Sequence, residues 1–297
     1  MMMKKNLYIV FALLLVAVCG ILQSEAESRE KRLNVIVSIL PQKYFVEQIA
    51  ADRVNVEVMV QPGSHPATYE PAPSQMAAIS KCDLYFAVGV PFEKAWLKKF
   101  RSANPDMRIV RTDAWIEKLP VERNGHSTDS VHEHGSGDPH IWLSPPLVMV
   151  QARHILTALV SADAENAQFY ESRYRKFISE TAELDEKLRS LFPPSETKPE
   201  FMVFHPSWGY FADAYGLRQT AVEKEGKSPK TAEIKRLVEY ARKKKIKVLL
   251  VQPQISSRTA EIIAREIGGK TVTADPLAEN WSENLLKVAA SISNAAR

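Results

Sequence analysis

The chain has 297 residues, of which 45% are hydrophobic, and a formal net charge of +4 at pH 7. A chain of this length and composition can bury the cores of two ordinary domains. The small net charge, with Lys and Arg dispersed among Asp and Glu, argues against nucleic acid as a partner.

The N-terminal residues have the pattern of a secretory signal. Two lysines precede an apolar stretch over residues 7–22, and Ser24-Glu25-Ala26 provides the small-x-small pattern that a signal peptidase accepts. We predict a signal peptide over residues 1–26 and a periplasmic mature protein with a net charge of about +3.

Two other interpretations of this segment stay open. A retained membrane anchor is the first, although the apolar stretch is short for a spanning helix of about 20 residues. A lipoprotein anchored at Cys19 is the second, although Val18 before it is bulkier than lipobox sequences usually tolerate. Cleavage would leave Cys82 as the sole cysteine, so we expect no intrachain disulfide and a fold stabilised by its core.

The next part of the chain alternates between apolar runs and helical periodicity. Strands are predicted at Val35–Leu40, Val54–Val60, Leu84–Val88 and Ile109–Val110, and helices at Tyr44–Ala51, Ser74–Lys81 and Phe92–Arg101. Such alternation is typical of βαβ units with a mainly parallel sheet. We therefore predict an N-terminal α/β lobe over residues 27–165. Within it, residues 122–137 are rich in Gly, Ser, Asp and His and are predicted to form a surface loop.

A single long helix is predicted over residues 166–192. This segment contains no Pro or Gly and places apolar side chains at helical spacing. About 25 helical residues span nearly 40 Å, which is long enough to run along two lobes. We expect its aromatic residues to pack in the core and the helix to restrict hinge motion.

The strand and helix alternation then restarts. Strands are predicted at Phe201–Phe204, Leu217–Val222, Val248–Val251 and Thr271–Thr273, with helices near Trp208–Tyr215, Thr231–Lys244 and Ser257–Ile267. The fold class predicted is therefore α/β, with two lobes that each contain a mainly parallel sheet flanked by helices, joined by the long rigid helix. The C-terminal lobe covers residues 193–297.

Four residues in widely separated segments could form a metal site. His65 and His205 directly follow predicted strands, Asp275 follows the last strand, and His140 lies in Asp138-Pro139-His140. The carboxyl ends of strands in open α/β sheets gather into a ligand crevice. Three imidazoles and one carboxylate suit Zn²⁺ in tetrahedral coordination, and four ligands favour holding the metal over activating a water. Whether Asp275 or a water is the fourth ligand stays open.

The remaining histidines have other roles. His154 lies within the helical stretch Gln151–Val160, and we interpret it as structural. His126, His132 and His134 lie in the predicted surface loop. They form either a second, weaker metal site or a polar linker.

The four ligand segments also resemble a known family. Gly63-Ser64-His65-Pro66, Asp138-Pro139-His140-Ile141-Trp142-Leu143, Phe204-His205-Pro206-Ser207-Trp208-Gly209-Tyr210 and Asp275-Pro276-Leu277 are similar to the signature segments of the zinc-binding solute receptors of ABC importers, the ZnuA type. The match covers nearly the whole mature chain in order. The resemblance implies two α/β lobes bridged by a long helix, Zn²⁺ held between them as the transported ligand, and delivery to a membrane permease. We also expect a monomer.

The same resemblance bears on the choice of metal. Manganese receptors of the superfamily usually carry a carboxylate where His205 stands, so the histidine favours zinc, in agreement with the preference of Mn²⁺ for oxygen ligands. Two departures limit the comparison. The histidine-containing loop is short, and Gln252 stands where relatives often carry glutamate.

Three other functions remain as alternatives. A manganese-specific receptor and a metal-binding adhesin belong to the same superfamily. The third is a zinc metallohydrolase, in which Glu70 would serve as the base. The absence of GxxxxGK[ST] and of GxGxxG after the first strand argues against a nucleotide-binding protein. We predict that the chain is not an enzyme.

Overall fold

A computed structural model of the chain describes residues 32–120, 137–223, 227, 229–254 and 258–296. The predicted signal peptide and the loop histidines His126, His132 and His134 lie outside the described residues. Residues Leu33–Arg297 form one compact unit, and the lobe boundaries proposed above remain a prediction.

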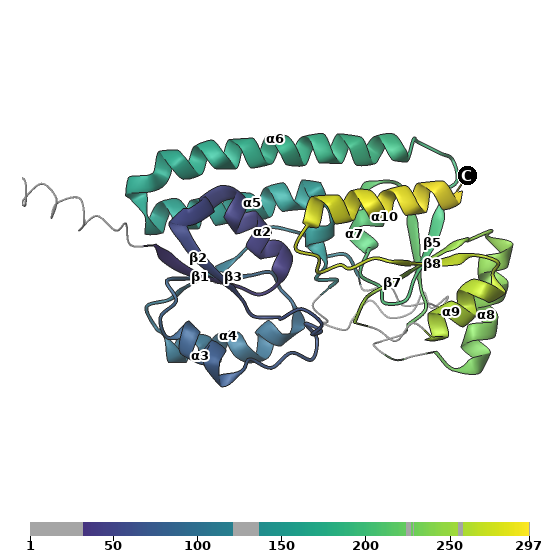
Figure 1. The fold of residues 1–297 in the computed structure, drawn as a ribbon, viewed down its shortest axis with the longest axis horizontal. Helices are drawn as coiled ribbons and strands as arrows, with labels where there is room; N and C mark the ends of the chain where they lie inside the picture. Colours follow the sequence, from purple (N-terminus) through teal and green to yellow (C-terminus); the bar gives the residue numbers. More distant parts are fainter. Residues whose placement is uncertain (1–31, 121–136, 224–226, 228, 255–257, 297) are drawn as a thin grey trace, which may run out of the picture. The chain divides into compact units, whose positions relative to one another are not determined.

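The first half of this unit is built around a four-stranded parallel sheet (Figure 1). Its elements are β1 (Leu33–Val37), α2 (Leu40–Ala50), β2 (Val54–Val58), α3 (Pro73–Ile79), β3 (Leu84–Ala87), α4 (Pro91–Ala103) and β4 (Arg108–Arg111). The strand order is β2-β1-β3-β4, and every pair is parallel. The carboxyl ends of all four strands therefore meet at one edge.

The second half repeats this arrangement. Its elements are β5 (Glu200–Val203), α7 (Gly209–Ala214), β6 (Arg218–Ala221), α8 (Thr231–Lys243), β7 (Val248–Val251), α9 (Arg258–Glu266), β8 (Lys270–Thr273) and α10 (Trp281–Ala296). The order β6-β5-β7-β8 is the same, and all pairs are again parallel. The predicted fold class is confirmed.

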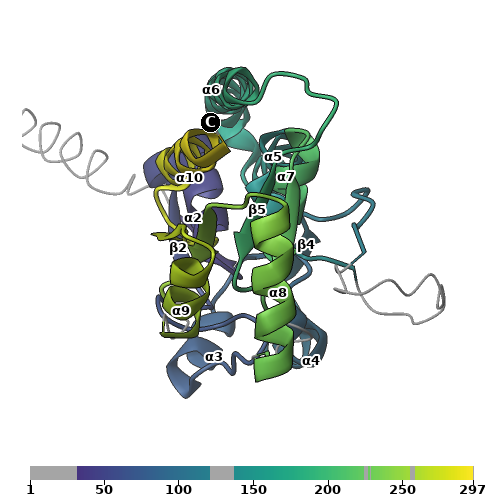
Figure 2. The ribbon, with the colours of Figure 1, turned by 90° about the vertical axis from the view of Figure 1, so that its right-hand side faces the viewer.

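Two long helices connect the halves. These are α5 (Pro145–Ala162) and the 25-residue α6 (Ala167–Leu191). The helix α6 packs against α5, α2 and α10, and in Figure 1 it extends alongside both sheets. Figure 2, which views α6 almost end-on, shows α5 and α10 beneath it. The long helix predicted from the sequence is therefore present, with Tyr170 and Phe177 of its aromatic stripe buried as expected.

The hydrophobic core is continuous between the halves. In β5, Phe201 and Val203 join the same cluster of buried residues as Val35 of β1, whereas Met202 joins a smaller cluster with the residues of α8 and α9. This separation follows from the strand geometry, because successive side chains point to opposite faces. One face of the second sheet thus shares its core with the first half, and the other face is covered by α8 and α9 (Figure 2).

One strand end and one helix start differ from the sequence predictions. The strand predicted over Val35–Leu40 ends at Val37, and α2 begins at Leu40 and not at Tyr44. The reason is Pro41, which lies in the first turn of α2, where its missing N–H is not needed.

The amphipathic helix α10 was not predicted, and it contributes Trp281 and Leu285 to the core. Among the described residues, no helix is long and apolar enough to cross a membrane.

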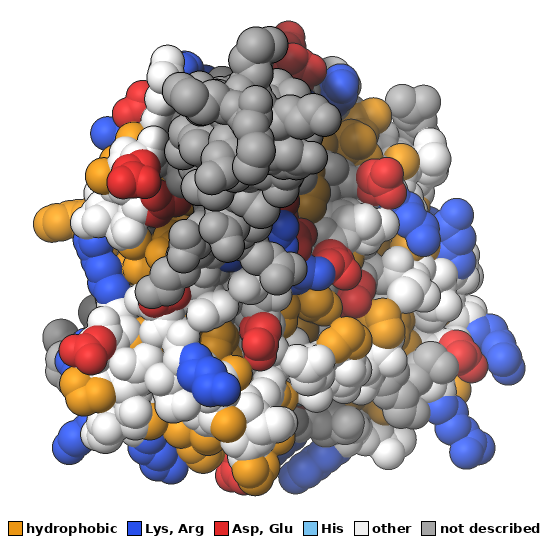
Figure 3. Space-filling model, turned by 60° about the vertical axis from the view of Figure 1, so that its left-hand side comes forward, with side chains coloured by type: hydrophobic (Ala, Val, Ile, Leu, Met, Phe, Trp, Pro, Cys, Tyr) orange, Lys and Arg blue, Asp and Glu red, His pale blue; other side chains and the backbone are white. Residues whose placement is uncertain are grey.

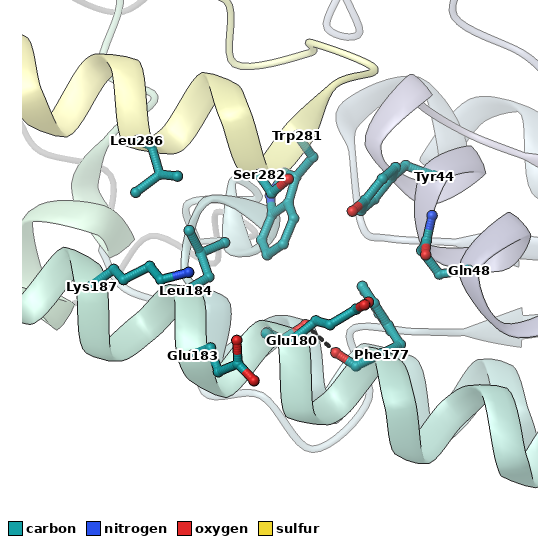
Figure 4. Close-up of a pocket in the computed structure, with 11 residues that line it drawn as sticks. Tyr44, Gln48, Phe177, Glu180, Glu183, Leu184, Lys187, Trp281, Ser282 and Leu286 are labelled. Atoms are coloured by element: carbon teal, nitrogen blue, oxygen red, sulfur yellow. Dashed lines mark hydrogen bonds between the residues drawn. The ribbon is translucent and has the colours of Figure 1, made fainter.

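Aromatic side chains join the helices of the two halves around a small cavity. The cavity has a volume of about 390 Å³ and lies between α2, α6 and α10 (Figure 4). Tyr44 of α2 lies 6.1 Å, between ring centroids, from both Phe177 of α6 and Trp281 of α10. On the molecular face in Figure 3, basic and acidic side chains are interspersed, as the small net charge leads one to expect.

Candidate metal centre

The His65 loop follows β2 and is fastened to the start of α4. Gly63 has a φ of 82°, a left-handed conformation that glycine adopts without strain, and this turns the chain toward His65. The Pro66 carbonyl then accepts a hydrogen bond from the Phe92 N–H of α4, at 3.2 Å. The Nδ1 atom of His65 accepts the Ala67 N–H at 3.1 Å. The position of the imidazole therefore depends on the position of α4.

A buried carboxylate fixes the start of α4. Glu93 is 3% exposed and accepts hydrogen bonds from the Ser38 hydroxyl (2.6 Å) and from the backbone N–H groups of Val88 and Gly89 (both 2.9 Å). Burial raises the pKa of Glu93 above its ordinary value. These bonds join the start of α4 to the ends of β1 and β3. The Phe92 N–H, which binds the Pro66 carbonyl of the His65 loop, is thereby fixed to the sheet.

His205 is placed by the pairing of β5 with β6. Beyond the strand ends, the parallel ladder continues through the Val222 N–H to Val203 carbonyl bond and the Glu223 N–H to Phe204 carbonyl bond. This register brings Glu223 beside His205, and Glu223 Oε2 lies 2.8 Å from His205 Nδ1. The two side chains are only 13% and 16% exposed.

His140 is held by the aspartate two residues before it. Asp138 Oδ1 accepts the His140 backbone N–H at 2.9 Å and lies 2.6 Å from its Nδ1. The Asp138 carbonyl accepts a 2.8 Å hydrogen bond from the Tyr210 hydroxyl of α7. A side chain at Gly209 would approach Asp138 Oδ2 to 3.0 Å, so the small residue permits this close packing. The segment is thus tied to the second half of the chain.

Two tryptophans join the His140 segment to the Asp275 segment. The Trp142 indole N–H donates to the Pro276 carbonyl, and the Trp281 indole N–H donates to the Trp142 carbonyl, both at 2.6 Å. Both indoles are almost fully buried. The ring centroids of His140 and Trp142 are 5.1 Å apart. The two segments are therefore linked through buried contacts.

The three imidazoles predicted from the sequence lie close together. The ring centroid of His205 is 5.1 Å from that of His65 and 5.7 Å from that of His140. Ligands bound at about 2.0 Å in a tetrahedral zinc site would have imidazole centroids roughly 5 Å apart. Burial, followed by the proximity of His205 and His140, lowers the pKa of His65, while Glu223 acts in the opposite direction. A lowered pKa favours the neutral imidazole, which is the form that binds metals.

Asp275 has other partners in this structure. Its Oδ1 accepts hydrogen bonds from the Gln254 side chain (3.2 Å) and the Leu277 N–H (2.9 Å). Over the described residues, no group of three or more His, Cys, Asp and Glu side chains has its donor atoms arranged around a single metal position. The structure thus gathers the three rings without forming a complete coordination shell, and the ligand role of Asp275 stays a prediction.

Other polar residues singled out from the sequence take structural positions. His154 Nε2 lies 3.1 Å from the Ala114 carbonyl, in agreement with its structural interpretation. Gln252 donates to the Ser207 hydroxyl at 3.1 Å. Glu70 is exposed.

Sequence reasoning did not identify the carboxylates that contact two of the imidazoles. Asp138 was noted only as part of its motif, and Glu223 not at all. The sequence signal available for Glu223 was its position directly after the predicted strand Leu217–Val222, because ligand-binding residues gather at the carboxyl ends of parallel strands.

Comparisons with known proteins identify the family and the fold of the chain. The family model described as "ZnuA: Zinc-uptake complex component A periplasmic" matches residues 35–295. The high-affinity zinc uptake system protein ZnuA of Bacillus subtilis is 29% identical over 288 residues, covering 93% of this chain and 90% of that protein. The manganese ABC transporter substrate-binding lipoprotein ScaA of Streptococcus gordonii is 27% identical over 281 residues, covering 89% and 87%. A crystal structure of ZnuA matches with a TM-score of 0.83 and 38% identity, over 90% of this chain and 100% of that one.

Proposed function

Because the chain belongs to the ZnuA family of periplasmic zinc-uptake components, we propose that it captures Zn²⁺ in the periplasm and delivers it to the permease subunit of an ABC importer. The observation that carries this proposal is the clustering of His65, His140 and His205, from three separate segments, at centroid distances suited to one ion. The family is one of metal-uptake receptors and not of enzymes, so the metallohydrolase alternative is set aside.

The proposed ligands are the imidazoles of His65, His140 and His205, with Asp275 or a water as the fourth ligand. In His140 and His205, Nδ1 faces a carboxylate, which leaves Nε2 available for the metal. Asp275 would join them by leaving Gln254 and Leu277. Because Asp275 and His65 belong to different halves, the return of Asp275 to these partners would open the coordination shell and allow release to the permease.

Zinc is proposed over manganese because three of the four donors are nitrogen. Manganese prefers carboxylate and water oxygens. In addition, zinc binds most nitrogen sites more tightly than manganese does. The manganese alternative is supported by the similarity to ScaA. We further propose that the mature protein begins after Ala26 and acts as a monomer.

The function is tested by metal analysis of the purified mature protein, followed by competition titration with Zn²⁺ and Mn²⁺. We expect one tightly bound zinc equivalent per chain, and zinc bound at least about 100-fold more tightly than manganese, in the order that nitrogen-rich sites follow. Retention of manganese in preference to zinc would support the manganese receptor. Absence of any tight divalent metal would contradict both proposals.

Zinc affinity is expected to fall in acid. The unperturbed pKa of histidine is about 6.5, and each imidazole that must lose a proton before binding weakens affinity by up to about tenfold per pH unit below its pKa. Because the pKa of His65 is lowered, this ring stays neutral to lower pH than an unperturbed histidine. Protons therefore compete with zinc for His65 only at a lower pH. Titrations between pH 5 and 8, corrected for protonation of the competing chelator, check this. An affinity that is constant down to pH 5 would contradict imidazole ligation.

A further inference from the structure

Two carboxylates contact the clustered imidazoles on the same ring atom. Asp138 Oδ1 lies 2.6 Å from His140 Nδ1, and Glu223 Oε2 lies 2.8 Å from His205 Nδ1. These carboxylates come from unrelated segments, one from the loop before α5 and the other from the end of β6. Both make charge-assisted hydrogen bonds in a largely buried setting, where such bonds are strong.

We propose that Asp138 and Glu223 are positioning residues, which fix the tautomer and orientation of His140 and His205 so that both present Nε2 to the metal. This inference rests on the proposed metal-binding function. A neutral imidazole carries one N–H, and an acceptor at Nδ1 keeps the proton there and leaves the lone pair on Nε2. The carboxylates themselves lie beyond the far side of each ring, so they orient the ligands and do not coordinate the ion.

Asp138 is held too firmly to serve as a mobile ligand. Its Oδ1 also accepts the His140 backbone N–H, its backbone N–H donates to the Leu119 carbonyl at 2.8 Å, and its carbonyl accepts from Tyr210. Its side chain is 6% exposed. Leaving the His140 ring would break an otherwise complete set of hydrogen bonds, so the carboxylate acts as a fixed acceptor.

Glu223 is fixed by the backbone of the sheet. Its own N–H pairs with the Phe204 carbonyl, directly before His205, so ligand and acceptor lie side by side on neighbouring strands. It is also close enough to His65 to raise the pKa of that residue, opposing the effect of burial. The β5–β6 register therefore sets the geometry of the pair.

His65 differs from the other two imidazoles. Its Nδ1 accepts a backbone N–H from Ala67, so in the neutral form described here the ring proton resides on Nε2. Two imidazoles are thus preset for the metal by carboxylates, and the third must exchange its hydrogen bond when the ion binds through Nε2. This makes His65 an internal control within the same protein.

The experiment uses the mature protein and the variants Glu223→Ala and Asp138→Ala, which remove the acceptor oxygens altogether, with Glu200→Ala as the matched control. Glu200 is on β5, 8% exposed in its side chain, and bonds to the Tyr240 hydroxyl, which is unconnected with the imidazoles. Long-range ¹H–¹⁵N spectra of the metal-free protein at about pH 8, where unperturbed imidazoles are neutral, report the tautomer of each ring. Zinc competition titration reports the affinity, and circular dichroism reports folding.

We expect the Nδ1–H tautomer for His140 and His205 in the wild type, with the Glu223→Ala variant losing it only at His205 and the Asp138→Ala variant only at His140. The pattern of His65 stays unchanged in both variants. Zinc affinity falls by about 10- to 100-fold in each, as is usual for such outer partners of ligands, and does not change in Glu200→Ala. If Asp138→Ala does not fold, Glu223→Ala carries the test alone.

Three results would overturn the inference. The first is an Nε2–H tautomer for His140 and His205 in the wild type, and the second is an unchanged affinity in both variants. The third is a loss as large as that caused by removing a histidine ligand, which would make the carboxylate a direct ligand. Failure of the wild type to bind zinc would instead refute the proposed function, and the tautomer spectra of the metal-free protein would still report whether the carboxylates orient the rings.

Discussion

Replacement of His140 by alanine is expected to weaken zinc binding by at least about 100-fold. A tight zinc site of four protein ligands contributes about 10–16 kcal/mol, or roughly 3 kcal/mol per ligand, and each 1.4 kcal/mol is a tenfold change in affinity. The structural reason is specific to this position. Asp138, which contacts the His140 ring, also bonds to Tyr210 in the second half of the chain. The ring centroids of His140 and His205 are 5.7 Å apart. Alanine also leaves the Asp138 carboxylate without its ring partner.

The matched control is His154→Ala. His154 is likewise a partly buried histidine, but its Nε2 faces the Ala114 carbonyl and its segment belongs to α5. Competition titration of both variants against a chelator of known affinity separates loss of a ligand from loss of any histidine. We expect His154→Ala to retain one tight zinc equivalent. An unchanged stoichiometry and affinity in His140→Ala would contradict the assignment of the site.

The second large effect is expected on stability, in the variant Trp142→Ala. The side chain is fully buried, and removal of a buried Trp lowers the free energy of unfolding by about 3–5 kcal/mol. The variant also loses the bond to the Pro276 carbonyl, which joins the His140 segment to the Asp275 segment. We therefore expect weaker zinc binding together with lower stability. Urea unfolding of the metal-free protein measures the change in stability independently of any change in zinc binding.

Two further variants separate packing from hydrogen bonding. Trp142→Phe retains an aromatic ring but leaves the Pro276 carbonyl without its donor, and a buried unpaired group costs about 1–3 kcal/mol. Trp115→Ala removes an indole that is 95% exposed, so the expected change is below about 0.5 kcal/mol. Equal losses for Trp142→Ala and Trp115→Ala would show that the buried indole contributes nothing special.

The fold could be predicted from the sequence because the residue patterns that specify its strands and helices lie within single short segments. The strand Val248–Val251 is a continuous apolar run and was predicted at its observed bounds, as expected for a buried parallel strand. The long helix was predicted from the absence of Pro and Gly over residues 166–192 and observed over Ala167–Leu191. The start of α2 was missed because Leu40 was assigned to the preceding apolar strand, although the proline that follows it is tolerated in the first turn of a helix.

The candidate site was only partly predictable. The rule that carboxyl ends of parallel strands meet at one edge places His65 at the edge of the first sheet and His205 at the edge of the second, whereas the approach of these two edges and of His140 depends on tertiary packing. The partners Asp138 and Glu223 depend on tertiary contacts. Glu223 lies 18 residues from His205, and only the register of β5 against β6 brings the two together. The bonds of Asp275 to Gln254 and Leu277 likewise have no signature in the sequence, which is why a four-ligand site was expected and three gathered imidazoles are observed.

The uninterrupted core has a consequence for how such receptors can be altered by recombination. Because apolar side chains of β1, β5 and α10 belong to one cluster, neither half is a self-contained module. A hybrid could join the N-terminal portion of this chain to the C-terminal portion of a homologue. Its core side chains would then not fit one another where the two portions pack, and the hydrogen bonds of Trp142 and Trp281 would be disturbed. Exchange of metal preference between homologues is therefore better pursued by substitutions around the imidazoles than by swapping halves.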